Sequence, residues 1–95
     1  ALPVVISSAL ETSVGLAWGV RAAATLPQLD YDCGLGTVAL LLGDVVEPSL
    51  IPEDGQLSVS QVTPTEALLT RYEASPERRN WWLKRLEACG RQLGL

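Results

Sequence analysis

Residues 5–16 read Val-Ile-Ser-Ser-Ala-Leu-Glu-Thr-Ser-Val-Gly-Leu, and this stretch decides the fold that we predict. Residues 2–8 are predicted to form a strand covered on both faces, because the apolar run from Leu2 to Ile6 is rich in β-branched side chains. An amphipathic helical pattern follows and ends at Pro27. Because α/β proteins bind ligands at the carboxyl ends of parallel strands, we expect Ser7 and Ser8 to lie at a ligand site.

A shorter copy of this arrangement follows. Residues 31–33 are predicted to form a strand, residues 34–37 (Gly-Leu-Gly-Thr) a turn, and the next residues a short helix that ends at Gly43. Two such βα units leave open sheet edges and an uncovered apolar face, whereas a closed (β/α)8 barrel needs roughly 250 residues. We therefore predict an α/β fold in which residues 1–43 are the last two βα units of a barrel.

The remaining residues, 44–95, are predicted to be a C-terminal extension of hairpin-like and helical segments that packs back on the barrel or on a capping region. Residues 56–62 alternate as a half-exposed strand does, after an Asp-Gly turn signal. Residues 63–66 combine a capping box with a proline and predict a short helix, and residues 75–77 begin the last helix in the same way. The apolar face predicted for that last helix is formed by Trp82, Leu86, Cys89 and Leu93, and Gly94 is predicted to end the helix.

Composition excludes several kinds of chemistry. The chain has no histidine, which removes the usual general base and the usual zinc ligand. Lys84 is its one lysine and lies in a charged helical stretch, where we expect a solvated role. Cys33 and Cys89 are expected to be free and largely buried. With a net charge of −4, no basic cluster, no bilayer-length apolar run and no signal-peptide pattern, we expect no nucleic-acid or membrane partner and a cytoplasmic location.

The candidate site residues each have a structural alternative. Ser8 and Glu11 have capping-box spacing, so the serines could cap the helix, and Glu11 is predicted to be a capping residue rather than an acid–base catalyst. Gly34, Leu35 and Gly36 would offer backbone N–H groups at a helix start to an anion, but a tight turn that needs glycine fits equally well.

Two further patterns are weak. Residues 34–39 fit the dinucleotide pattern G-x-G-x-x-A, but the preceding strand is short and the helix ends early, so we predict no nucleotide cofactor. The spacing of Asp30, Asp32 and Asp44 fits no calcium loop, and we assign no metal ligand in this chain.

The Ile-Ser-Ser-Ala-Leu-Glu-Thr-Ser-Val-Gly-Leu motif of residues 6–16, followed by Cys-Gly-Leu-Gly-Thr at residues 33–37, resembles the o-succinylbenzoate synthases of the enolase superfamily. The actinobacterial members are especially similar, and the similarity extends to Ser-Pro-Glu-Arg-Arg-Asn-Trp-Trp at residues 75–82. The resemblance implies that the chain is the C-terminal portion of an enolase-superfamily barrel enzyme.

The resemblance also implies a function. These enzymes are Mg²⁺-dependent dehydratases of menaquinone biosynthesis, in which a lysine removes a proton α to a carboxylate and water is lost. The lysines and the Mg²⁺ ligands belong to earlier strands, so no catalytic or metal-binding residue is assigned here and the chain alone is expected to be inactive. The partners implied are a small-molecule carboxylate substrate and the remainder of the barrel or another chain.

The substrate-binding residues that the resemblance favours are Ser7, Ser8, Gly34, Leu35 and Gly36. At least one of the serines would contact the succinyl carboxylate of the substrate or line its pocket. Other superfamily enzymes, an N-acylamino-acid racemase or a muconate cycloisomerase, remain alternatives, as does a non-catalytic anion-binding or interaction module.

Overall fold

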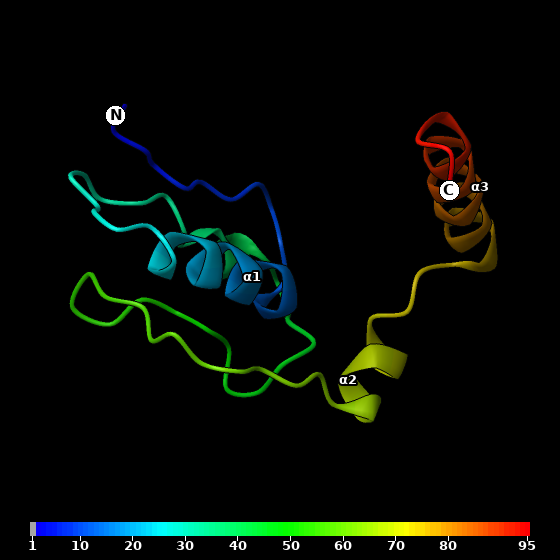
Figure 1. The fold of residues 1–95 in the computed structure, drawn as a ribbon. Coiled ribbons are helices and arrows are strands. Elements are labelled where there is room, and N and C mark those ends of the chain that lie inside the picture. Colours follow the sequence, from blue (N-terminus) through cyan, green and yellow to red (C-terminus); the bar gives the residue numbers. More distant parts are fainter. Residues whose placement is uncertain (1) are drawn as a thin grey trace.

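A computed structural model describes residues 2–95 of the chain (Figure 1). The helical elements, in chain order, are α1 (Ser13–Ala24), the 3₁₀ helix η1 (Thr37–Leu40), α2 (Glu66–Arg71) and α3 (Pro76–Gln92). Extended and irregular segments join them, and within residues 2–95 strand pairing is limited to isolated bridges.

The two predicted strands meet in parallel at a single bridge between Ser7 and Gly34. The N–H of Gly34 donates to the carbonyl of Ile6 over 2.9 Å, and the N–H of Ser8 donates to the carbonyl of Gly34 over 2.8 Å. The parallel direction is the one that a βα unit requires. The prediction of two regular strands is wrong for this structure, because parallel strands need partners on both edges and residues 2–95 supply one rung of pairing. The barrel units therefore stay a prediction.

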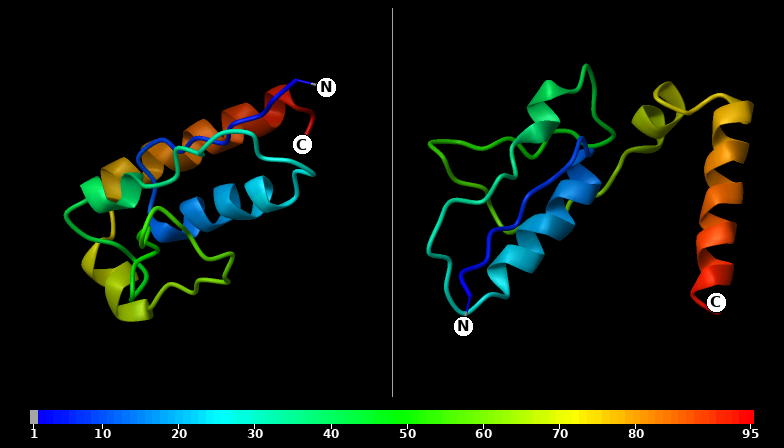
Figure 2. Two further views of the ribbon diagram at one scale, coloured as in Figure 1. Left: turned by 90° about the vertical axis from the view of Figure 1, so that its left-hand side faces the viewer. Right: turned by 90° about the horizontal axis from the view of Figure 1, so that it is seen from above.

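The core forms around α1, which lies between the N-terminal extended segment and the loop of residues 44–62 (Figures 1 and 2). Buried side chains from α1 and from the η1 region meet there: Leu16, Val20, Ala23, Leu35 and Val38. Partly buried neighbours from these two segments and from the residues before η1 complete it: Ile6, Leu50, Leu57 and Cys33. Small residues let α1 pack closely, since a Cβ on Gly19 would lie 3.0 Å from Cδ2 of Leu35.

The loop of residues 44–62 follows the turn prediction but not the strand prediction. Asp54 and Gly55 have φ of 50° and 74°, and Glu53 and Gln56 exchange two backbone hydrogen bonds of 2.9 Å across them. This is the geometry of a two-residue hairpin turn, for which Asp-Gly is a strong signal. The half-exposed strand predicted over residues 56–62 is wrong, because the pairing ends at this one antiparallel bridge.

Helix α2 is tied to the start of that loop. The N–H of Thr65 donates to the carbonyl of Val45 over 3.0 Å, and the ring of Tyr72 lies directly against Gly43. The residue that caps α2 is Thr65, whose Oγ1 accepts from the N–H of Leu68 over 3.3 Å. The predicted start two residues earlier is therefore wrong.

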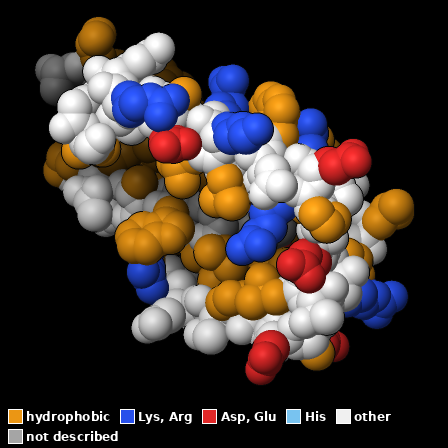
Figure 3. Space-filling view, turned by 90° about the vertical axis from the view of Figure 1, so that its right-hand side faces the viewer, with side chains coloured by type: hydrophobic (Ala, Val, Ile, Leu, Met, Phe, Trp, Pro, Cys, Tyr) orange, Lys and Arg blue, Asp and Glu red, His pale blue; other side chains and the backbone are white. Residues whose placement is uncertain are grey.

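Helix α3 begins and ends as predicted but stands apart from the core (Figures 1 and 2). Ser75 caps it by accepting from the N–H of Arg78 over 3.3 Å, and Gly94 follows it with φ of 74°. No two helices of the described chain pack along one another. The apolar face of α3 consequently lies open, with Leu86 70% exposed. Figure 3 shows hydrophobic side chains among Lys and Arg on this side of the molecule.

The cysteine prediction is half right. Both thiols are free, but Cys33 is only partly buried and Cys89, on the open face of α3, is exposed. The expectation that both are largely buried is therefore wrong.

The described chain leaves more surface uncovered than a compact protein of its size. Its accessible area is 7637 Å², against about 5300 Å² expected for a folded monomer of this mass. Its radius of gyration is 15.7 Å, against about 12 Å for a compact domain. Leu2 and Leu42 illustrate the excess, with 89% and 107% exposure. No helix within residues 2–95 combines the length and the apolar character needed to cross a membrane.

Candidate functional site

The candidate site lies where the N-terminal extended segment meets residues 34–37. The parallel bridge brings Ser7 and Ser8 beside Gly34, as the two βα units predict. The side chain of Ser7 lies against Gly34, since a Cβ at position 34 would be 3.0 Å from Ser7 Oγ. Ser7 is exposed, and its hydroxyl forms no hydrogen bond within residues 2–95.

Ser8 is held by two neighbours. Its Oγ lies 3.1 Å from the carbonyl oxygen of Gly34 and 2.8 Å from Oγ1 of Thr37. Because Thr37 donates its own proton to the carbonyl of Ala9, it accepts from Ser8. The single Ser8 proton is thus engaged within the protein, whereas that of Ser7 is available to a ligand.

The predicted capping box of Ser8 and Glu11 is wrong. Helix α1 begins at Ser13 with Thr12 as its N-cap residue, and the N–H of Ser8 is bonded to Gly34 rather than to Glu11. Glu11 instead accepts from the N–H of Ala9 over 3.4 Å. Ser8 forms its hydrogen bonds with Gly34 and Thr37 instead of with the start of the helix, so the alternative that Ser8 caps the helix is also wrong.

Residues 34–36 offer fewer N–H groups than predicted. The N–H of Gly34 is bonded to Ile6, which leaves those of Leu35 and Gly36 without a partner in the part of the chain that is described. The side chain of Leu35 is buried in the core, so only its backbone can face a ligand. η1 is a four-residue 3₁₀ helix and contributes little of the dipole that was expected to attract an anion.

Neither Gly34 nor Gly36 is a glycine because of its backbone conformation. The positive-φ glycines of residues 2–95 are Gly55 and Gly94, and Gly36 has φ of −112°. The tight-turn alternative is therefore wrong. Gly34 permits the close approach of Ser7, whereas a Cβ on Gly36 would reach Pro52 Cγ only at an ordinary 3.5 Å.

Asp44, which the sequence suggested only as a weak metal candidate, organises the start of α1. Its Oδ1 accepts from the N–H of Ser13 over 3.0 Å and from that of Val45 over 2.8 Å, and its Oδ2 accepts from Ser13 Oγ. Ser13 is fully buried, and its Oγ also accepts from the N–H of Leu50 over 2.8 Å. Burial alone would raise the pKa of Asp44, but hydrogen bonds led by those from Ser13 outweigh it, and the pKa lies below its usual value.

Thr37 and Asp44 are the residues that sequence analysis missed. Thr37 follows the second predicted strand, and Ser8 ends the first, so the repeat could have pointed to Thr37. Asp44 had only an indirect signal, the absence of an acidic residue in the first turn of α1.

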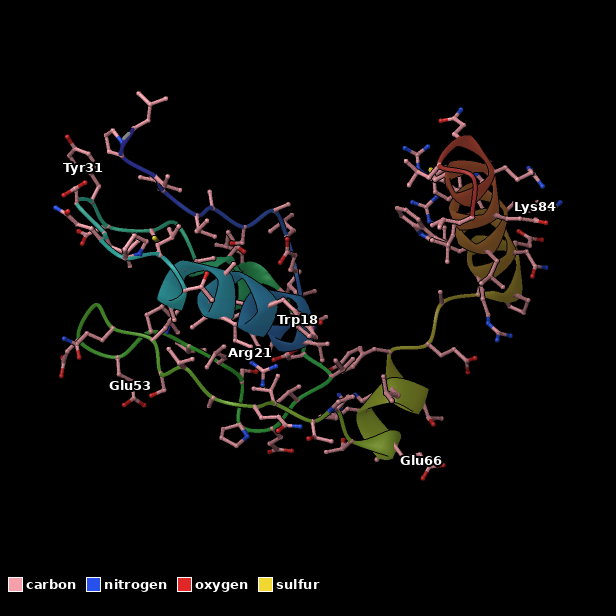
Figure 4. The ribbon with its side chains drawn as sticks, in the orientation of Figure 1. Trp18, Arg21, Tyr31, Glu53, Glu66 and Lys84 are labelled. Atoms are coloured by element: carbon pink, nitrogen blue, oxygen red, sulfur yellow. The ribbon has the colours of Figure 1, made fainter. Side chains whose placement is uncertain are left out.

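The described residues near the candidate site form neither a metal site nor a lysine-based proton-transfer site. Within residues 2–95 no three Asp, Glu or Cys side chains gather as a metal site would require. The oxygens of Asp44 are occupied by protein donors, so the residues present do not fit a Mg²⁺ site. Lys84 is exposed on α3, which lies apart from the N-terminal segment (Figure 4).

A hollow of about 590 Å³ adjoins the candidate site without including its serines. α1, residues 29–36 and residues 52–59 line it, with Leu35 and Gly36 on its wall. Since Ser7 and Ser8 lie outside it, the described residues do not close a pocket around the two serines.

Comparison with known proteins finds similar sequences in three mycobacteria. No family model matches the chain. It is 53% identical over 88 residues to proteins from Mycobacterium ulcerans and Mycobacterium marinum, and 53% identical over 89 residues to one from Mycobacterium tuberculosis. All three are named o-succinylbenzoate synthase, and the alignments cover 93–94% of this chain. The chain is thus homologous to the o-succinylbenzoate synthases, as its motifs predicted, and it spans 27% of the length of these relatives.

Proposed function

We propose that the protein to which this chain belongs is an o-succinylbenzoate synthase, a dehydratase of menaquinone biosynthesis. The observation that carries the proposal is 53% identity over 93% of the chain to curated proteins of that name. It extends across the serine motif, the residues 34–37 turn and α3, so it rests on more than one short pattern.

In this enzyme the chain supplies one wall of the substrate site. Ser7 donates its free hydroxyl proton to a substrate carboxylate, and the unpartnered N–H groups of Leu35 and Gly36 lie on the neighbouring segment. Ser8, bonded to Gly34 and Thr37, holds the two segments together instead of acting as a donor. Charge-assisted hydrogen bonds from hydroxyl and N–H groups are a strong way to bind a carboxylate.

The reacting groups come from elsewhere in the protein. The resemblance implies that lysines carry out the proton transfers and that Mg²⁺ stabilises negative charge on the substrate when bound. Exposed Lys84 and the dispersed carboxylates of residues 2–95 serve neither role, and the isolated chain is accordingly inactive.

Residues 1–43 are proposed to be the final barrel units and residues 44–95 the extension that packs back on the barrel or capping region. On the exposed apolar face of α3, Arg78 lies over the ring of Trp82, 5.7 Å from its centroid, and beside that face Arg78 and Arg85 lie 4.9 Å and 5.7 Å from the Trp81 centroid. A face of this kind fits a surface that is apolar at its centre and acidic at its rim, on the remainder of the protein or on another chain. We expect the assembled enzyme to act in the cytoplasm, without nucleic-acid or membrane partners.

The first test is the reaction itself. The purified full-length protein with Mg²⁺ is incubated with the cyclohexadiene substrate, and formation of o-succinylbenzoate is followed. N-acylamino acids and muconate are assayed in parallel. Turnover of either of these with no o-succinylbenzoate formed would assign the protein to the corresponding alternative, and no turnover of any substrate would favour the non-catalytic module.

The second test concerns the site. Gly36→Val in the full-length enzyme is expected to raise KM, because the added side chain would block the approach of a substrate carboxylate to the backbone. The melting temperature should change little, because the added Cβ meets only ordinary van der Waals contact. Ser7→Ala should also raise KM, through loss of one hydrogen bond to a charged group, by about tenfold. A large loss of stability with KM unchanged in the surviving Gly36→Val enzyme would make the glycine structural.

A further inference from the structure

The first turn of α1 lacks a cap of its own. The side chain of its N-cap residue Thr12 makes no capping hydrogen bond, and no acidic residue lies in the first turn. The first N–H groups of a helix have no partner within it and carry the positive end of the helix dipole. Asp44 meets that need from 31 positions along the chain, by accepting from the N–H of Ser13.

This arrangement fixes the segment between the serines and the helix. Residues 9–12 form neither helix nor strand, so their position depends on what holds their ends. At one end Ser8 and Thr37 hold the chain, and at the other Asp44 holds Ser13 by both its N–H and its hydroxyl. Removing either hold would loosen this four-residue segment beside Ser7.

The hold at Ser13 also reaches the following loop. Because Ser13 Oγ accepts from the N–H of Leu50, and Asp44 accepts from that of Val45, the carboxylate joins the start of α1 to residues 44–50. Leu50 in turn packs on the core cluster. The position of the carboxylate is therefore fixed by a loop that packs on the core.

We infer that Asp44 is a positioning residue for the substrate site, which holds residues 9–12 and thereby sets the direction of the Ser7 hydroxyl toward the substrate carboxylate. The inference rests on the proposed function of this site. Asp44 itself touches no substrate, and it acts through Ser13 and residues 9–12.

The experiment compares three variants of the full-length enzyme at a temperature where each remains folded. Asp44→Ala should lower kcat/KM roughly ten- to hundredfold, mostly through KM, because small displacements of positioning groups have effects of this size. Asp44→Asn keeps the shape and can still accept from Ser13 N–H, so it should lose less. Asp30→Ala, which removes an exposed carboxylate bonded only to Gln28 within the described residues, is the matched control and should leave both constants unchanged.

A double-mutant cycle separates positioning from general stability. If Asp44 acts through the direction of Ser7, the loss in kcat/KM caused by Ser7→Ala should be much smaller in the Asp44→Ala background than in the wild type. Hydrogen exchange of residues 9–12 should also become faster in Asp44→Ala, while exchange in α3 stays the same.

Two results would overturn the inference alone: an active wild type in which Asp44→Ala keeps its KM, or fully additive effects of the Ser7 and Asp44 changes. A wild-type protein that forms no o-succinylbenzoate would instead overturn the proposed function, and with it any positioning of that substrate.

Discussion

Helices α1 and α3 begin in opposite ways. The start of α3 is encoded locally, by the Ser75 cap and by Pro76 and Glu77 in its first turn. The start of α1 has no such signal and depends on Asp44, which is distant in the sequence. The difference shows that the start of α1, beside the candidate site, is determined by tertiary contacts, whereas the start of α3 is determined by its own local sequence.

The two helices also differ in what they bury. α1 places Leu16, Val20 and Ala23 in the core, whereas α3 has no buried residue in the described chain. α1 therefore owes its stability to packing, which is the usual case in proteins, and α3 relies on its caps and on surface contacts until another surface covers it.

The largest effect is expected from the centre of the α1 core. Leu16→Ala should lower the free energy of unfolding of the full-length protein by about 2–5 kcal/mol, because Leu16 is 0% exposed and the change leaves a cavity. Urea denaturation measures the loss. Leu16→Met, which nearly conserves volume, should cost less than about 1.5 kcal/mol. Equal losses for both variants would contradict a packing role.

A smaller effect is expected where α2 meets the loop. Gly43→Ala should destabilise by about 1–3 kcal/mol, since the new Cβ would overlap the ring of Tyr72 and displace it. Thermal melts of Gly43→Ala, Tyr72→Ala and the double variant measure it. The double variant should be no less stable than Tyr72→Ala alone, and additive losses would show that the ring is not the cause.

These contrasts explain which parts of the fold the sequence could predict. The start of α3 at Pro76 and its stop before Gly94 follow from residues within a few positions of each end, and both predictions are confirmed. The body of α1 is confirmed as well, but the capping-box spacing of Ser8 and Glu11 predicts the wrong start, because the carboxylate that holds the start lies on a distant loop. The regular strands failed since strand pairing needs neighbours that residues 2–95 do not provide.

The candidate site divides in the same manner. The nearness of Ser7, Ser8 and Gly34 followed from the rule that parallel strands end at one edge, and the bridge confirms it. The bonds of Thr37 to Ser8 and Ala9 join residues that are 29 and 28 positions apart, and no local sequence pattern predicts them. Whether these residues bind substrate stays a prediction.

A peptide experiment sharpens the comparison between the two helix starts. In a synthetic peptide of residues 73–95, Ser75→Ala should reduce helix content, with a loss of about 1 kcal/mol from the missing cap. Circular dichroism measures the helix content, and Ser75→Asp should restore it. A peptide of residues 10–26, which lacks Asp44, should show little helix. A strongly helical α1 peptide would refute its dependence on the distant carboxylate.

The smallest effect on stability is expected from lowering the pH. Acid protonates Asp44, which holds the start of α1, but it does not change the Ser75 hydroxyl that caps α3. The pKa of Asp44 is lower in the folded protein than in the unfolded chain, so the folded state binds fewer protons. The resulting stabilisation is fully present above the unfolded value of about 4 and disappears as the pH falls through the lower folded pKa. Because Asp44 remains partly exposed, the effect is modest.

Melts of the wild type and of Asp44→Asn should therefore differ by a constant amount above about pH 5 and converge in more acidic buffer. A difference that persists unchanged through this range would show that Asp44 holds α1 by shape alone and not by its charge.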